Sequence, residues 1–466
     1  MVKRLFGLIL GLIGLSSLCS ALCSQILPSP EPDQPSSSLS REPFLVGAGS
    51  CSASGCHNAN GHSGTKASEY STWIASDPHA RASSVLGSDL SRKMLSRYRG
   101  ISETAADPQK EPLCLSCHVF PDPTLKQGSY EGRFSAADGV SCEACHGKAS
   151  QWVSTHYQSS WKNLSPEEKS HFGFVETRNL AIRARTCVQC HVGEKEMDVN
   201  HDLIAAGHPR LRFEMGSFLA NYSSRHWRQS DEIARDSNHS WNIWATGQVV
   251  GTKASLDLLS YRANQKTKPW PELSEYNCAS CHHNLSGEFG KQSSNGKMHF
   301  GTWSNLSGDI PVYSPPNYLW DKKSKEDLAS LKLLMVRIGT RRAEVEVLAQ
   351  RLAQSLDRGA SHLAPPPSPK EVRNWIDDYE RSIKENKIKP NWDQDTQTYL
   401  MLRAYYQNAR ELGEKFSPEL EKHLGEFQEE LYAAFQKNTN AILHSPEKYD
   451  PRVSRKWLKK VGEDLR

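Results

Sequence analysis

Residues 139–147 read Gly139-Val140-Ser141-Cys142-Glu143-Ala144-Cys145-His146-Gly147, and the C-x-x-C-H pattern at their centre decides how the chain folds. Two thiols at this spacing reach the two vinyl groups of a haem and form thioether bonds with them, while the imidazole that follows binds the haem iron. The stretch therefore predicts a covalently attached c-type haem, around which the chain folds.

The same pattern occurs in three more places and, with a longer gap, in a fourth. Three segments match C-x-x-C-H without deviation: Cys114–Cys117–His118, Cys187–Cys190–His191 and Cys278–Cys281–His282. In the remaining segment, Cys51-Ser52-Ala53-Ser54-Gly55-Cys56-His57, four residues separate the cysteines, and Gly55 gives the longer loop backbone freedom. The chain is therefore expected to bind about five haem c groups, with their irons held by His57, His118, His146, His191 and His282.

Disulfides and zinc are the alternative uses of paired cysteines. Ten of the twelve cysteines fall in the five motifs, and the other two, Cys19 and Cys23, lie in the N-terminal apolar segment. Disulfides form in oxidising compartments, and zinc is held by C-x-x-C units at ribbon spacing. Neither needs a histidine directly after every second cysteine, so the pattern favours haem.

A second axial ligand for each iron has to come from elsewhere in the chain. Residues 43–320 contain ten further histidines, more than five irons require. Those expected as distal ligands are His79, His156, His201, His208 and His283. His62 and His226 are held in reserve, and His171 and His299 are expected at the surface or behind a ligand. His201 and His208 are seven residues apart, about two turns if helical, so they are expected to serve two different haems.

Composition sets the domain organisation. The chain has 466 residues, a net charge of +4 and only 37% hydrophobic residues, which argues against a nucleic-acid role and leaves the haems to supply the missing interior. We expect a signal peptide at 1–24, with a basic start and an apolar run too short to span a bilayer, and a Pro/Ser-rich linker at 25–42. A multihaem cytochrome c domain at 43–320 and a helical C-terminal domain at 321–466 follow.

The expected fold class is mainly α with much irregular structure, ending in a helical bundle. Apolar residues recur at helical spacing from Leu328 to Leu352, with Ser324 and Asp327 at the start of the pattern. Ser368-Pro369-Lys370-Glu371 reads as a helix start, and Ser417-Pro418 opens another helix, whose apolar face runs from Leu420 to Phe435.

The motifs also resemble a known family. Gly139–Gly147, with His156 shortly after, is similar to a haem segment of the cytochrome c-554 family, and so is Trp73–Ala82, in which His79-Ala80 follows a tryptophan. The resemblance covers about residues 43–310, although the wide gap at Cys51–Cys56 and the fifth motif depart from the four-haem layout. It implies that His79 and His156 are distal ligands. It also implies an open iron at the Cys114–His118 haem, because the family's second haem lacks a protein distal ligand.

Two functions are consistent with these motifs. The first is an exported, periplasmic electron carrier, because irons with two imidazole ligands leave no position for a substrate. The alternative is a haem oxidoreductase with one five-coordinate iron that acts on a small nitrogen or sulfur oxyanion, with Arg210 or His226 nearby. Whether the protein is an enzyme is left open, although the related pentahaem nitrite reductases end one motif in lysine and every motif here ends in histidine.

The expected partners are redox proteins. A membrane-associated electron-transfer complex is a further possibility, in which the C-terminal helices would dock the protein on its partner. No nucleic-acid partner is expected.

Overall fold

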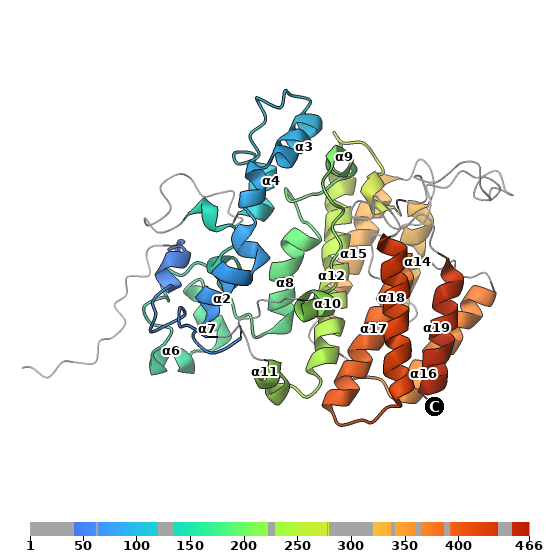
Figure 1. Ribbon diagram of the computed structural model, residues 1–466. Helices are drawn as coiled ribbons and strands as arrows, with labels where there is room; N and C mark the ends of the chain where they lie inside the picture. The colour runs from blue at the N-terminus through green and yellow to red at the C-terminus, as the bar shows by residue number, and fades with distance from the viewer. Residues whose placement is uncertain are drawn as a thin grey trace, which may run out of the picture. The chain divides into compact units, whose positions relative to one another are not determined.

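The structure is a computed structural model that describes residues 42–61, 64–119, 135–221, 229–276, 278, 320–336, 341–359, 363, 365–385, 392–436 and 450–465. Short helices alternate with irregular segments up to residue 235, and longer helices follow (Figure 1). Within the described residues there is no β-strand, and Glu194 and Met197 form an isolated antiparallel bridge. The expected fold class, mainly α with much irregular structure, is confirmed.

The short helices of the N-terminal part are mostly one to three turns long. They are α2 (Glu69–Ser76), α3 (Asp89–Arg99), α4 (Pro112–His118), α5 (Cys142–His146), α6 (Ser159–Asn163), α7 (Pro166–His171), α8 (Leu180–His191), α9 (His201–Ala206), α10 (Met215–Asn221) and α11 (Gln229–Arg235). Five 3-10 helices accompany them: η1 (Ala48–Cys51), η2 (Pro78–Arg81), η3 (Ser84–Gly87), η4 (Ala136–Asp138) and η5 (Leu273–Glu275).

The longer helices begin with α12 (His239–Asn264). The others are α14 (Lys322–Met335), α15 (Arg342–Gly359), α16 (Pro369–Lys384), α17 (Trp392–Glu411), α18 (Pro418–Gln436) and α19 (Pro451–Asp464). None of the described helices is both long and apolar enough to cross a membrane.

Capping residues set the starts of the C-terminal helices. The expected start of α16 is confirmed: Ser368 Oγ accepts a hydrogen bond from the Glu371 N–H at 3.3 Å, and Glu371 Oε2 accepts one from the Ser368 N–H at 2.7 Å. The expected start of α14 was too late, because Asp321 Oδ1 accepts from the Ser324 N–H at 2.7 Å and the helix begins at Lys322.

Helix α12 lies between two apolar cores and joins them. Its Trp241 and Trp244 are fully buried with Phe427 and other side chains of α16–α19, while its Leu256 and Leu259 pack with side chains of α14 and α15. Each buried leucine contributes about 2 kcal/mol. Residues Phe44–Arg466 accordingly form one compact unit, in which α12 contacts α8, α15 and α17.

A buried ion-pair cluster ties α8, which carries one of the motifs, to α11 and α12. Glu232 on α11 lies 2.6 Å from Arg183 NH2 on α8 and 3.0 Å from His239 Nε2 on α12. The Glu232 side chain is only 5% exposed. Burial alone would raise the pKa of Glu232, but the hydrogen bonds from His239 and Arg183 lower it to about 2.

This cluster makes stability depend on pH in the acid range. The folded pKa of Glu232, about 2, lies below the ordinary value of about 4.3, so the carboxylate contributes stability above that ordinary value and loses it as pH falls towards 2. Glu232→Gln should therefore unfold at lower denaturant concentration than the unchanged chain at pH 7. The difference should shrink steadily towards pH 3.

Asp257→Asn is the control for this measurement, because Asp257 is half exposed and pairs with Lys253 at the surface. This change should cost little at any pH. A gap between Glu232→Gln and the unchanged chain that stays constant from pH 7 to pH 3 would contradict the assignment.

Candidate haem-binding site

Three of the C-x-x-C-H motifs lie at the ends of helices. Helices α4, α5 and α8 each end on the histidine of their motif, His118, His146 and His191. Residues three and four apart lie on one face of a helix, so the last turn presents both thiols and the imidazole to the same side. The motif with the wider gap begins at Cys51, the last residue of η1, and continues as a turn in which the Cys56 N–H donates to the Ala53 carbonyl at 2.9 Å.

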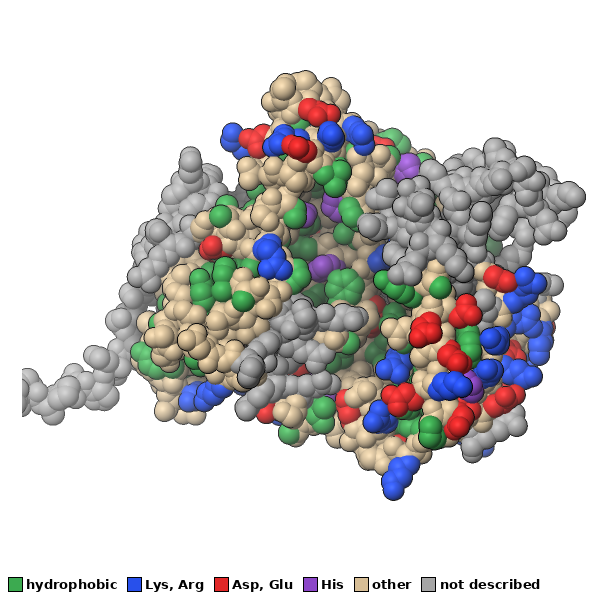
Figure 2. All heavy atoms as spheres, viewed as in Figure 1, with side chains coloured by type: hydrophobic (Ala, Val, Ile, Leu, Met, Phe, Trp, Pro, Cys, Tyr) green, Lys and Arg blue, Asp and Glu red, His purple; other side chains and the backbone are tan. Residues whose placement is uncertain are grey.

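One large cavity collects these motifs. Its volume is about 1930 Å³, against about 300–1,000 Å³ for the usual small-molecule pocket. Figure 2 shows histidine side chains among apolar ones in the hollowed part of this face of the molecule. The cysteines and histidines of four motifs line the cavity: Cys51, Cys56, His57, Cys114, Cys117, His118, Cys142, Cys145, His146, Cys187, Cys190 and His191.

Three motif histidines each face a second histidine across this cavity. The ring centres of His57 and His156 are 6.0 Å apart, and those of His79 and His191 are 6.1 Å apart. Those of His118 and His208 are 6.4 Å apart. All three partners, His79, His156 and His208, are among the residues expected as distal ligands.

The spacing of these pairs fits an iron between the two rings. Two metal–imidazole bonds of about 2 Å each and two ring radii of about 1 Å each bring the ring centres about 6 Å apart. Rings that packed directly against each other in a T-shape would also lie 4.5–7 Å apart, so distance alone is not decisive. A second observation is therefore needed.

The hydrogen bonds of the Nδ1 atoms are a second observation that supports an iron between the rings. His118 Nδ1 lies 3.0 Å from the Ala82 carbonyl, His156 Nδ1 2.9 Å from the Val153 carbonyl, and His208 Nδ1 2.8 Å from the Pro209 carbonyl. In His57 and His79 the partner is a carboxylate, Glu69 or Asp77, at 3.0 Å. These acceptors hold the proton on Nδ1, so that Nε2 is the nitrogen that would bind a metal. The side chains therefore fit haem irons with two axial imidazoles, and a bound haem would supply a reversible one-electron couple.

Burial favours the neutral imidazole, the form that binds a metal, in two of these histidines. Burial lowers the pKa of His191 to about 4, and burial likewise lowers the pKa of His208. His57 differs, because its hydrogen bond to Glu69 raises its pKa.

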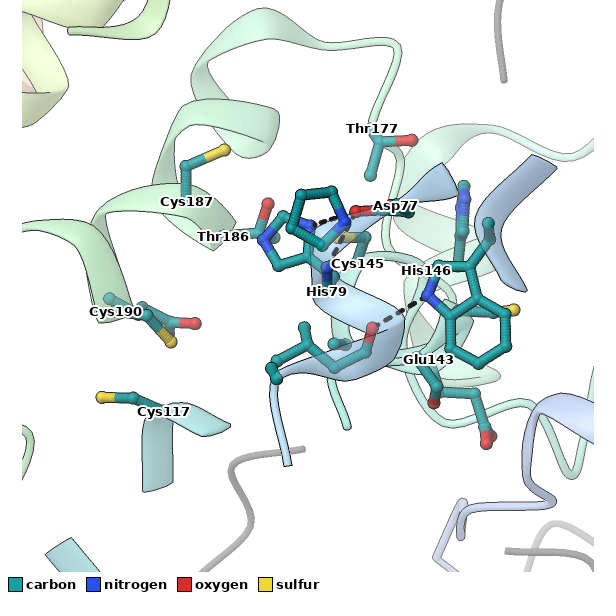
Figure 3. A pocket seen from close by; sticks show the side chains of 18 of the residues that line it. Asp77, His79, Cys117, Glu143, Cys145, His146, Thr177, Thr186, Cys187 and Cys190 are labelled. Carbon is teal, nitrogen blue, oxygen red and sulfur yellow. Dashed lines mark hydrogen bonds and ion pairs between the residues drawn. The ribbon is translucent and has the colours of Figure 1, made fainter. Parts of the chain in front are cut away.

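The cysteines show which motifs are neighbours. The nine described cysteines of the motifs are free thiols. The Cys51 thiol hydrogen-bonds to Cys142, which lowers the pKa of Cys51, and the same contact with Cys190 lowers the pKa of Cys117. Burial and, to a smaller extent, the nearby Cys187 raise the pKa of Cys145 to about 12. Figure 3 shows Cys117 beside Cys190, and Cys145 and Cys187 at the same pocket.

Glu143, inside the C-E-A-C-H motif, anchors the first motif to the third. Its buried carboxylate accepts hydrogen bonds from the backbone N–H groups of Val46 at 3.0 Å, Gly47 at 2.8 Å and Ala149 at 2.8 Å. Burial raises the pKa of Glu143 in spite of these bonds. Residues 46–47 directly precede η1, so this carboxylate holds Cys51 beside Cys142.

The remaining expected ligands are placed only in part. His201 begins α9, where its backbone N–H donates to Glu272 Oε1 at 2.8 Å. The segment from His201 to His208 is not two continuous helical turns, because α9 ends at Ala206 and Gly207 follows with a φ of 123°. Cys278 lies 3.5 Å from Arg210 NH1. Cys281, His282, His283, His62, His226 and His299 lie outside the described residues, as do residues 1–41.

Two further expectations can be compared with the geometry. His208 lies opposite His118, at the Cys114–His118 motif for which the resemblance implied an open iron. His171 is exposed at the end of α7, as expected for a surface histidine.

Sequence reasoning missed the carboxylates that surround the motifs. Asp77 and Glu69 contact axial candidates, Glu143 orders the first motif, and Glu232 holds the motif helix α8. The spacing Asp77-Pro78-His79 is a signal that could have been recognised, because an Asp at a helix N-cap lies close to the residue two positions later.

Paired thiols, opposed imidazoles and a mainly helical, irregular fold define a multihaem c-type cytochrome. Comparison with protein families agrees: the model of the family "cytochrome c554 and c-prime" matches residues 51–147. The resemblance to this family is thereby confirmed for the stretch that holds the first three motifs, and covalently bound haem c with iron is the cofactor that it implies. No curated protein and no solved structure gave a significant match.

The role of Glu143 can be tested by its removal. Glu143→Ala leaves the N–H groups of Val46, Gly47 and Ala149 buried without an acceptor, which should lower the free energy of unfolding by about 3 kcal/mol. Denaturant titration of the haem-loaded protein measures this. Glu143→Gln, which keeps one acceptor oxygen, should lose less. Equal stability of all three proteins would show that the carboxylate does not anchor the segment.

Proposed function

We propose that the protein is an exported electron carrier that passes electrons along about five covalently bound haems, most of them held by two histidines. The observation that carries this is the set of three opposed histidine pairs, in which the Nδ1 atoms of His57, His79, His118, His156 and His208 contact acceptors. An iron with two imidazole ligands changes oxidation state with little rearrangement and offers no position to a substrate.

The pairs support a distal ligand for each of three haems. His156 would bind the iron of the Cys51–Cys56 haem opposite His57, and His208 that of the Cys114–Cys117 haem opposite His118. His79 would bind the iron of the Cys187–Cys190 haem opposite His191. For the Cys142–Cys145 haem, His146 is the proximal ligand, and Phe174 packs 6.5 Å from its ring.

The thiol contacts support an order in which the haems exchange electrons. Cys51 contacts Cys142, Cys145 is close to Cys187, and Cys190 contacts Cys117. The haems would thus follow one another as Cys51/Cys56, Cys142/Cys145, Cys187/Cys190 and Cys114/Cys117. Arg210 follows His208 by two residues and contacts Cys278, which would set the fifth haem next in the row.

Export and partners complete the proposal. Haem attachment to two thiols suits a chain that leaves the cytoplasm, and residues 1–24 have the composition of a signal peptide. In the periplasm the carrier would meet redox proteins as its donor and acceptor, and a membrane-associated complex is a candidate partner.

The number of haems is tested by a pyridine haemochrome assay on the purified protein. Five haems per chain are expected, and Cys51→Ala/Cys56→Ala should lower the number by one. Four haems in both proteins would contradict the assignment of Cys51 and Cys56.

The ligand assignments predict the spin state of the irons. The ferric protein should be mainly low-spin, and His79→Ala, His156→Ala or His208→Ala should each convert one haem to a high-spin form that binds cyanide. His171→Ala is the control and should leave the spectrum unchanged, because His171 is exposed on α7. A high-spin iron in the unaltered protein that binds nitrite or nitric oxide would instead favour the oxidoreductase.

A further inference from the structure

The three opposed histidine pairs differ in the acceptors that their Nδ1 atoms contact. In the pair of His118 and His208 both acceptors are neutral backbone carbonyls, those of Ala82 and Pro209. In each of the other two pairs one ring contacts a carboxylate: His57 contacts Glu69, and His79 contacts Asp77, both at 3.0 Å. The sites therefore differ in charge directly behind an axial ligand.

Asp77 is the more strongly placed of the two carboxylates. Its side chain is 3% exposed, whereas that of Glu69 is 27% exposed. Asp77 Oδ1 also accepts the backbone N–H of His79 at 2.9 Å, as the N-cap of η2. Figure 3 shows Asp77 beside His79 at the pocket. A buried carboxylate with two hydrogen-bond contacts acts on its neighbour through a lower dielectric than a partly exposed one.

A carboxylate behind an axial imidazole draws its Nδ1 proton and makes Nε2 a stronger electron donor to the iron. Stronger donation stabilises the ferric state relative to the ferrous state and lowers the reduction potential. A neutral carbonyl draws the Nδ1 proton less strongly and therefore lowers the reduction potential less. The acceptor behind each ring should therefore set the order of the reduction potentials of the haems.

We propose that Asp77 and Glu69 are positioning residues that lower the reduction potentials of the His79/His191 and His57/His156 haems below that of the His118/His208 haem. This inference rests on the proposed function, since it requires haems at these pairs. Each iron would accept one electron from a reduced donor protein, or from the preceding haem, and pass one electron on. The net transfer of an electron from the Cys51/Cys56 haem to the Cys114/Cys117 haem would then be energetically downhill.

The ring planes give each class of site its own spectroscopic signature. The planes of His57 and His156 are 14° apart, whereas those of the other two pairs are 81° and 83° apart. Parallel imidazoles lift the near-degeneracy of two iron d orbitals and give a rhombic low-spin EPR signal. Perpendicular imidazoles preserve it and give a signal of large g anisotropy. The His57/His156 haem can thus be followed separately.

The test is a redox titration of the haem-loaded, full-length protein, monitored by EPR. Glu69→Gln should raise the midpoint potential of the rhombic signal and leave the large-anisotropy signals unchanged. Asp77→Asn, which keeps an N-cap acceptor, should raise the midpoint potential of one large-anisotropy signal. This increase should be larger than the one that Glu69→Gln causes in the rhombic signal. Asp89→Asn is the matched control, because it removes a carboxylate that is 83% exposed and pairs with Arg92.

A second measurement needs no variant. In the unaltered protein the rhombic signal should be reduced at a lower potential than at least one large-anisotropy signal. A rhombic signal with the highest potential of the three overturns the inference. The inference is also overturned if Glu69→Gln and Asp77→Asn retain their haems and have the midpoint potentials of the unaltered protein. A shift in midpoint potential for Asp89→Asn as large as that for Asp77→Asn would overturn it as well. Absence of low-spin haem would instead remove the proposed function itself.

Discussion

Two imidazoles that bind one iron must face each other across a few ångströms, and this requirement governs the arrangement of the N-terminal part of the chain. The three described pairs join residues far apart in sequence, such as His57 with His156 and His79 with His191. Local structure provides each ring separately, at the end of a helix or in a turn. Long-range contacts then bring the rings together: the Glu143 carboxylate draws residues 46–47 to α5, and the Arg183–Glu232–His239 cluster holds α8 against α11 and α12.

The interiors of the two parts of the chain are filled in different ways. The C-terminal helices bury Phe427, Leu331 and similar side chains in ordinary apolar cores, with α12 shared between them. Described residues between Ser50 and Arg235 instead surround a large cavity with short helices, and flat apolar haems are the groups that fit its thiols and imidazoles. This division accounts for the low apolar content of the chain, 37%, because part of the interior comes from the cofactor.

Carboxylates connect the fold to the proposed electron transfer. Asp77 and Glu69 sit directly behind candidate axial ligands, and Glu143 and Glu232 hold the segments that carry the motifs. All four are acidic side chains at least partly shielded from solvent, and each is held by hydrogen bonds or ion pairs. Such groups tie the geometry of a site to its electronic properties, because one side chain both orients a ligand and sets the field around it.

The sequence alone determined the chemistry of attachment, because the C-x-x-C-H spacing is local: two thiols and an imidazole within five residues need only one helical turn to face one haem. The start of α16 was predictable for the same reason, since Ser368 and Glu371 are close along the chain. The start of α14 was missed by three residues, because Asp321 competes with Ser324 for the cap.

Only the tertiary structure decided which histidine faces which motif. The sequence contains more histidines than five irons need as second ligands. Spacing along the chain carries no information about contacts between residues that lie far apart in it. His208 shows this clearly: α9 ends at Ala206, the chain turns at Gly207, and the His208 ring lies opposite His118. Which rings contact a carboxylate and which a carbonyl was likewise decided by packing, since those acceptors act through space.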